Sequence, residues 1–150
     1  ILRDEEFPIA DLWYIACDRL VNNQRYKNFC LDNEFITQSG IYFKTSAETT
    51  FAYLIKDNEF IESHTALDDA RIEMEILTKA LKKGKIEPTM QAFPFRDLGT
   101  TYEYVRTKTK YAEIVANRVK EHLDTFDNNS AYTTRLENIY YSLMAIVEEM

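Results

Sequence analysis

Glycine, proline and cysteine are scarce in this chain of 150 residues, which contains three glycines, three prolines and two cysteines. Together with ten tyrosines and nine phenylalanines, this composition excludes a disordered or low-complexity segment and favours a folded, helix-rich domain. Long apolar runs are also missing. Because none approaches the roughly eighteen residues that cross a bilayer, we expect no membrane partner.

The two cysteines, Cys17 and Cys30, lie in apolar stretches and match neither a zinc-ligand spacing nor a dense disulfide framework. Buried thiols in a reducing compartment are the simplest interpretation, so we expect a cytoplasmic protein. The N-terminal residues lack the basic-then-apolar pattern of a signal peptide. Because the chain begins with Ile1 rather than Met, we expect that residues upstream are missing from it.

The net charge of −7 is unevenly distributed. The first 80 residues carry eight Lys and Arg against fifteen Asp and Glu, whereas residues 79–120 carry ten basic residues against four acidic ones. A basic and aromatic stretch in the second segment could follow a phosphate backbone with bases near its rings. It comprises Tyr102, Tyr104, Arg106, Lys108, Lys110, Tyr111, Arg118 and Lys120, of which Arg106, Lys108 and Lys110 are the candidate nucleic-acid contacts. The alternative is a solvated helix face bordered by packed tyrosines.

Local signals predict short elements near the N-terminus. Residues 7–10 are typical of a short strand, and Asp11 is placed to cap a helix that reaches Val21. Trp13 in this helix is expected in the core. A second helix is predicted over residues 24–33.

A small hairpin is predicted next, in which a turn at residues 38–40 joins two short apolar stretches. Thr45 and Glu48 then have the spacing of a capping box, in which each side chain satisfies a free backbone amide of the other. This pattern predicts a helix from there to about Lys56.

The strongest helical pattern begins just after His64 and predicts one buried face. Its apolar residues are Leu67, Ala70, Met74, Leu77 and Leu81, with Ile72, Ile76 and Ala80 widening the stripe. Residues 85–99 are a connector. Two further helices are predicted over residues 101–123 and 131–150, and the turn and cap at 127–130 predict that they form an antiparallel hairpin.

One short motif carries chemistry. His64 precedes the long helix and Asp69 falls in its first turn, so both lie at one end of the same element. An imidazole with its ordinary pKa of about 6.5 accepts a proton from water, and a carboxylate is a ligand for Mg²⁺ or Mn²⁺. The alternative is structural: a histidine that only makes loop hydrogen bonds, and an acidic residue that complements the helix dipole.

The segment Glu62-Ser63-His64-Thr65-Ala66-Leu67-Asp68-Asp69-Ala70-Arg71-Ile72-Glu73 resembles the third exonuclease motif of the DEDD superfamily, in its histidine-containing subclass. Residues 9–17 look like the strand and helix that precede this motif, and residues 44–48 look like a helix start of phage-type members. The resemblance covers roughly residues 7–98.

This family consists of 3′-to-5′ exonucleases, so the resemblance implies two-metal hydrolysis of phosphodiesters at the 3′ end of DNA or RNA. By position, His64 would be the general base that activates the attacking water. Asp69 would be one of four acidic ligands of Mg²⁺ or Mn²⁺. The implied fold is the C-terminal portion of an α/β ribonuclease-H-like exonuclease domain over residues 1–98, followed by a helical tail over 99–150. Seen alone, the chain should be mainly helical with a few short strands.

Two of the family's acidic motifs have no convincing counterpart here. Asp4-Glu5-Glu6 reads Asp-x-Glu, but it lies too near His64 to be the family's first motif. We therefore expect an incomplete part of a phage-type hydrolase, inactive alone and acting in the host cytoplasm. The alternative is a noncatalytic helical module that binds nucleic acid or a protein, and its C-terminal helices are candidates for a partner contact or self-association.

Overall fold

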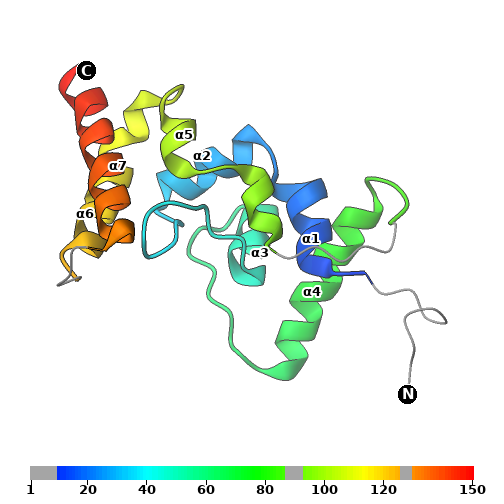
Figure 1. The fold of residues 1–150 in the computed structure, drawn as a ribbon. Coiled ribbons are helices and arrows are strands. Elements are labelled where there is room, and N and C mark those ends of the chain that lie inside the picture. Colours follow the sequence, from blue (N-terminus) through cyan, green and yellow to red (C-terminus); the bar gives the residue numbers. More distant parts are fainter. Residues whose placement is uncertain (1–9, 87–92, 126–129) are drawn as a thin grey trace. The chain divides into compact units, whose positions relative to one another are not determined.

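The computed structural model describes residues 10–86, 93–125 and 130–150, and 66% of these residues are helical (Figure 1). The elements in chain order are α1 (Leu12–Ala16), the π-helical turn η1 (Cys17–Val21), α2 (Gln24–Asp32), α3 (Ala47–Ile55), α4 (Ala66–Leu81), the 3₁₀ helix η2 (Pro94–Leu98), α5 (Thr101–Val105), the 3₁₀ turn η3 (Thr109–Tyr111), α6 (Ala112–Leu123) and α7 (Ala131–Glu148). No helix in the described residues has the length and apolarity to cross a bilayer.

The expected α/β ribonuclease-H-like fold is wrong for the part of the chain that the structure describes, because those residues form no strand and no sheet. The predicted hairpin is reduced to a single antiparallel bridge between Ile36 and Phe43. Its two apolar stretches are too short to build a ladder, and a sheet is stabilised by rows of paired residues rather than by one pair. The strand predicted at residues 7–10 lies almost wholly outside the described residues.

The chain divides into two compact units. The first contains the described residues up to Lys27 together with Thr45–Leu98, and the second contains Asn28–Lys44 together with Gly99–Met150. One division point falls between Leu98 and Gly99. Residues 28–44, by contrast, belong with the C-terminal residues.

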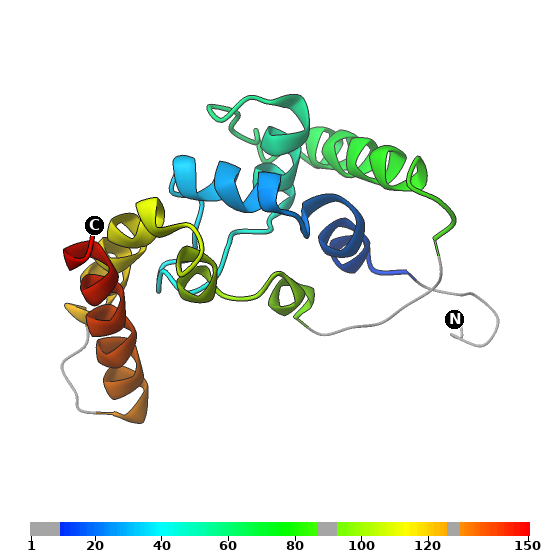
Figure 2. The ribbon, with the colours of Figure 1, turned by 90° about the horizontal axis from the view of Figure 1, so that it is seen from above.

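In the first unit, α4 packs against α1 and α3 (Figures 1 and 2). The α1 helix starts where the sequence predicts, because Asp11 accepts hydrogen bonds from the backbone amides of Trp13 at 2.8 Å and Tyr14 at 3.4 Å. The expectation that Trp13 belongs to the core is wrong: its side chain is 39% exposed. The ring stacks on Phe95 of η2 with centroids 5.7 Å apart, and its Nε1 donates to Thr45 at 2.9 Å.

Both cysteines are buried and neither takes part in a disulfide, as predicted. Cys17 is 1% exposed, and this burial raises the pKa of its thiol to about 11. Such a thiol stays protonated and unreactive at neutral pH, so it acts as a small apolar core residue.

Only part of the apolar stripe predicted for α4 is buried. Ile72, Ile76 and Ala80 are buried, whereas Leu67 is 62% and Met74 61% exposed. Both sets repeat at helical spacing, and the sequence alone does not say which of them the neighbouring helices cover. Contact with α1 and α3 selects the row at residues 72, 76 and 80.

The capping box predicted at Thr45 and Glu48 does not form. Ser46 caps α3 instead, accepting a hydrogen bond from the amide of Thr49 at 3.2 Å. The Thr45 hydroxyl instead accepts a hydrogen bond from Trp13 Nε1, and the Glu48 carboxylate accepts a 2.8 Å hydrogen bond from the amide of Glu62. Tertiary partners therefore compete successfully with the local cap.

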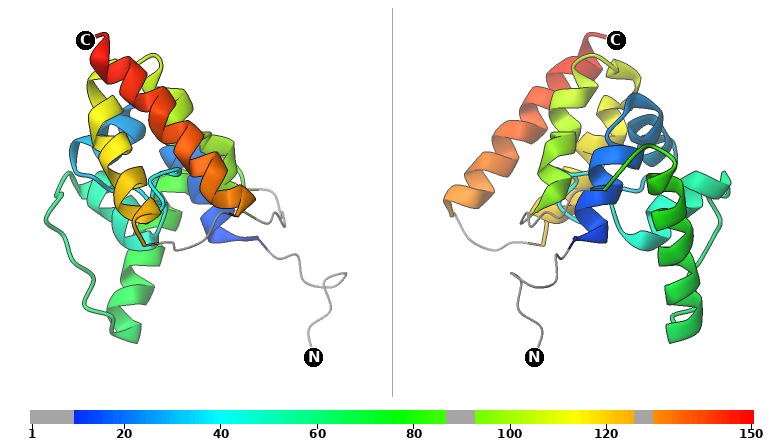
Figure 3. Two further views of the ribbon diagram at one scale, coloured as in Figure 1. Left: turned by 60° about the vertical axis from the view of Figure 1, so that its left-hand side comes forward. Right: turned by 90° about the vertical axis from the view of Figure 1, so that its right-hand side faces the viewer.

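In the second unit, α6 and α7 pack as an antiparallel hairpin, as predicted (Figure 3). Ser130 caps α7 by accepting from the amide of Thr133 at 3.1 Å. The helix predicted over residues 101–123 is broken into α5, η3 and α6. The break falls at Lys108, whose backbone is not helical (φ −123°, ψ 66°).

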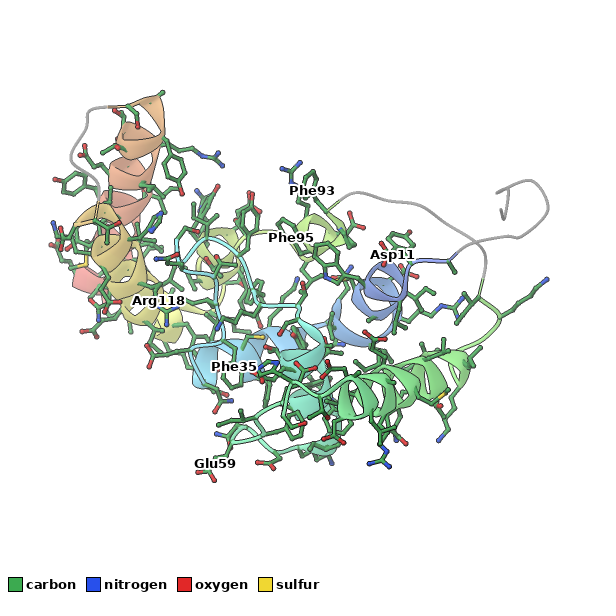
Figure 4. All side chains as sticks on the ribbon, turned by 90° about the horizontal axis from the view of Figure 1, so that it is seen from below. Asp11, Phe35, Glu59, Phe93, Phe95 and Arg118 are labelled. Atoms are coloured by element: carbon green, nitrogen blue, oxygen red, sulfur yellow. The ribbon has the colours of Figure 1, made fainter. Side chains whose placement is uncertain are left out.

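Residues 34–43 form almost no strand hydrogen bonds with one another, and their conformation depends on contacts with α6. Arg118 is labelled in Figure 4. Its guanidinium donates to the carbonyl groups of Ile36 at 3.1 Å, Thr37 at 3.3 Å and Glu34 at 3.4 Å. Gly40 has a φ of +82° and lies so close to α6 that an added Cβ would come within 3.1 Å of the backbone nitrogen of Val119. A glycine is required there for both reasons.

Candidate catalytic site

His64 and Asp69 lie at the N-terminal end of α4, the element where the sequence places them. Thr65 is the N-cap and accepts a hydrogen bond from the amide of Asp68 at 3.3 Å. His64 immediately precedes this cap with a φ of +58°, a left-handed conformation that costs a non-glycine residue about 1–2 kcal/mol. Its side chain is 77% exposed. Backbone strain of this kind clusters at active sites and ligand-binding segments, and Glu34, Lys56 and Phe93 share it in this chain.

Asp68 holds this loop in place. Its Oδ2 accepts hydrogen bonds from the hydroxyl groups of Ser63 at 2.6 Å and Thr65 at 3.0 Å, and its Oδ1 forms an ion pair with Arg71 at 3.4 Å. The hydrogen bond from Ser63, followed by that from Thr65, lowers the pKa of the Asp68 carboxyl. Asp68 therefore bridges the residues on either side of His64.

Glu62 is a functional candidate that sequence reasoning missed. Its Oε2 lies 3.9 Å from Nδ1 of His64, and only 16% of its side chain is exposed. A hydrogen bond to the Asp69 carboxyl raises the pKa of Glu62; burial and the charge of Asp69 add to the rise, and His64 opposes it. The position of Glu62 two residues before His64 is the signal that could have indicated it.

One of the two carboxylate oxygens of Asp69 is unsatisfied among the described residues. Its Oδ1 is buried and has no hydrogen-bond partner among the described residues. A buried carboxylate oxygen without a partner is costly unless a proton or a cation satisfies it. Glu62 and Asp69 are therefore neighbouring carboxyl groups, and the interaction with Asp69 is the largest cause of the raised pKa of Glu62.

The site does not fit a pair of metal ions by itself. In the part of the chain that the structure describes, no group of three or more His, Cys, Asp or Glu residues is placed to hold a metal ion. Mg²⁺ and Mn²⁺ need several oxygen ligands, and the Glu62–Asp69 pair with His64 at its edge falls short of that number. The chemistry that these residues can perform unaided is acceptance of a proton by the exposed imidazole.

The candidate nucleic-acid contacts occupy the junction between α5 and α6. Arg106 is exposed at the C-cap of α5, Lys108 is half-buried in the break, and Lys110 is exposed with its Nζ 4.8 Å from the centre of the Tyr111 ring. The structure places them within five residues of one another but gives each a different setting.

Three other members of the basic and aromatic stretch are used inside the second unit. The Tyr104 hydroxyl donates to Asn28 at 2.6 Å, and the Tyr111 hydroxyl donates to Asp32 at 2.7 Å. Tyr111 is 4% exposed, and its burial raises the pKa of the phenol to about 12. Because Tyr104, Tyr111 and Arg118 all bind other parts of the fold, they are not available to bases or phosphates.

Comparison with family models, with curated proteins and with solved structures finds no match to this chain.

Proposed function

We propose that this chain carries part of the active site of a metal-dependent 3′-to-5′ exonuclease acting on DNA or RNA, with His64 as the general base. The observation that carries the proposal is the arrangement around His64. Its imidazole is largely exposed, its backbone has a left-handed conformation, and the Glu62 carboxyl group lies 3.9 Å from Nδ1. The polarity of digestion and the substrate class come from the resemblance of residues 62–73 to the third exonuclease motif.

The proton chemistry follows from these positions. A neutral His64 accepts a proton from a water molecule at Nε2, and the resulting hydroxide attacks the phosphorus of the terminal phosphodiester. The P–O3′ bond breaks and a nucleoside 5′-monophosphate is released. The 3′-oxygen of the shortened strand takes up a proton from water, and the imidazolium returns its proton to solvent. Glu62 near Nδ1 stabilises the imidazolium that forms, as a carboxylate does for the histidine of other hydrolytic sites.

Asp69 is proposed as one metal ligand, the role that its position in the motif gives it. Its buried, unpartnered Oδ1 supports this role, because a bound cation would satisfy that oxygen. Since the described residues do not complete a metal site, activity requires further carboxylates from outside them. The proposal extends to a phage-type protein in the host cytoplasm, where Mg²⁺ is the natural cation.

The incomplete set of carboxylates favours a second candidate function, a noncatalytic helical module that binds nucleic acid or a protein. In that case the C-terminal helices are the contact surface for a partner or for a second copy of the chain. Such a module binds nucleic acid in EDTA and is insensitive to changes at His64 and Asp69. It differs from the exonuclease because it shortens no substrate when Mg²⁺ or Mn²⁺ is added.

The test uses the product of the complete reading frame that encodes these residues. We expect Mg²⁺- or Mn²⁺-dependent shortening of 5′-labelled single-stranded DNA or RNA, read as a ladder on a denaturing gel, that His64→Ala and Asp69→Asn each abolish. His122→Ala, which removes the other histidine, and Glu75→Gln, which neutralises an exposed carboxylate of α4, are the matched controls. Circular dichroism verifies that all four variants keep their helices. Activity that survives in both site variants would sink the proposal.

A further inference from the structure

A groove of about 440 Å³ lies between α5 and α7, entirely within the second unit. Tyr102 and Arg106 line it from the α5 side, and Arg135 and Asn138 line it from α7. Ile139, which is 8% exposed, contributes to an apolar floor. This combination of an apolar floor with a few polar groups, in this range of volumes, is typical of ligand sites.

The groove has one sign of charge. Two of the described residues that line it are arginines, and none of them is acidic, although the whole chain carries a net charge of −7. Arginine keeps its charge at any physiological pH and binds phosphate through two parallel hydrogen bonds. The lining therefore favours an anionic ligand, although the protein as a whole is negatively charged.

One of the arginines lies beside an aromatic ring. Arg135 and Tyr102 both line the groove, and the interaction with the Tyr102 hydroxyl, more than the nearby Tyr42 and Tyr132, raises the pKa of the guanidinium. The half-buried ring of Tyr102 therefore lies beside a positive charge, and Asn138 adds an amide that both donates and accepts hydrogen bonds.

From this juxtaposition we propose that the α5–α7 groove binds a single-stranded segment of nucleic acid, with phosphates on Arg106 and Arg135 and a base on the ring of Tyr102. Stacking on aromatic rings beside basic side chains is how single strands are held without sequence preference. The choice of nucleic acid over another polyanion rests on the proposed exonuclease function. The sequence-based candidate Arg106 belongs to this surface, and Arg135, Tyr102 and Asn138 complete it.

The test measures binding of the full-length protein to fluorescein-labelled oligothymidylate and oligouridylate of 20 nucleotides by anisotropy, in EDTA. Asn138→Asp adds one negative charge to the groove with almost no change in volume, and Asn117→Asp adds the same charge to an exposed position of α6 outside the groove. We expect Asn138→Asp to weaken binding about tenfold or more, since a like charge beside a phosphate is strongly unfavourable, and Asn117→Asp to weaken it much less.

Two further variants test the individual contacts. Arg135→Ala should lower the slope of log K against log salt concentration by about 0.7, the value for one phosphate contact on a single strand, whereas Arg25→Ala, an exposed arginine of α2 outside the groove, should leave the slope unchanged. Tyr102→Ala should weaken binding more than Arg25→Ala.

Equal effects of Asn138→Asp and Asn117→Asp would overturn the proposal. Displacement of the oligonucleotide by an acidic peptide or by inorganic phosphate at equal charge concentration would also overturn it, in favour of a general anion site. Because the assay contains EDTA and no turnover, its failure is separate from failure of the exonuclease proposal. His64→Ala should leave the binding unchanged.

Discussion

Replacing Arg118 with methionine should loosen residues 34–43 while α6 and α7 remain folded. Methionine keeps most of the apolar stem of the side chain and removes the guanidinium that serves three carbonyl groups. Residues 34–43 lack a strand ladder to replace those hydrogen bonds, because the only bridge among the described residues there joins Ile36 and Phe43.

The magnitude follows from the geometry. Nη1 of Arg118 is shared between Ile36 at 3.1 Å and Thr37 at 3.3 Å, and Nη2 reaches Glu34 at 3.4 Å, so the three contacts amount to about two hydrogen bonds from a charged donor. Each is worth about 1.5–3 kcal/mol when buried. Two such bonds would contribute about 3–6 kcal/mol if they were buried. Because 25% of the side chain is exposed and the contacts are long, we expect a smaller total of about 2 kcal/mol.

Hydrogen exchange of individual amides measures this loss. The amides of Thr37, bonded to Tyr42 at 2.8 Å, and Lys44, bonded to Phe35 at 3.0 Å, should exchange about 30-fold faster in Arg118→Met, because about 2 kcal/mol corresponds to that factor. Amides of α7 should be unaffected. Arg118→Lys, which keeps the charge but not the fork of donors, should show an intermediate effect.

Glu121→Gln is the control, since its exposed ion pair with Arg118 spans 3.9 Å and should contribute less than about 1 kcal/mol. If Arg118→Met leaves the exchange of Thr37 and Lys44 within threefold of the wild type, the Arg118 guanidinium does not stabilise residues 34–43. A phosphate-binding role for Arg118 would then be open again.

Two further predictions concern stability. The pKa of Glu62 is raised in the folded protein, so the folded state binds the Glu62 proton more tightly than the unfolded state does. This contribution to stability is lost as pH rises through the raised pKa. Glu62→Gln should therefore raise the thermal midpoint at pH 8 and change it little at pH 3. A Glu62→Gln variant that melts at or below the wild-type temperature at pH 8 would argue against the Glu62–Asp69 pair. Gly40→Ala should cost about 1–3 kcal/mol more than Gly99→Ala in urea unfolding, because both glycines have similar left-handed φ values of +82° and +76° but only Gly40 lies against the α6 backbone. Equal costs at the two positions would show that backbone strain alone matters.

Helix starts were predictable where the capping side chain has no competitor. Asp11 and Ser130 cap α1 and α7 as expected, because an N-cap bonds amides two or three residues along the chain. The absence of the cap at Thr45 could not be predicted, since Thr45 and Glu48 have partners 32 and 14 residues away in sequence.

The candidate site shows the same limit. Helical spacing correctly placed His64 and Asp69 at one end of α4, and their roles remain predictions that the experiments above test. The spacing gave no sign of the contacts of Glu62 with His64 and Asp69, which depend on how the loop before α4 folds back. The apolar pattern of α4 likewise contains two rows of side chains, and only the neighbours α1 and α3 decide which row is buried.

By itself, the sequence of this protein determined its helical character, several helix ends, the burial of both cysteines and the motif around His64. Each of these depends on interactions within a few residues or on composition. The tertiary structure alone decided the absence of a sheet in the described residues, the pairing of Glu62 with Asp69, the internal use of Tyr104, Tyr111 and Arg118, and the groove that joins Arg106 to Arg135. These features bring together side chains distant in sequence, and burial and hydrogen bonding in the folded chain select among alternatives that local pattern leaves equal.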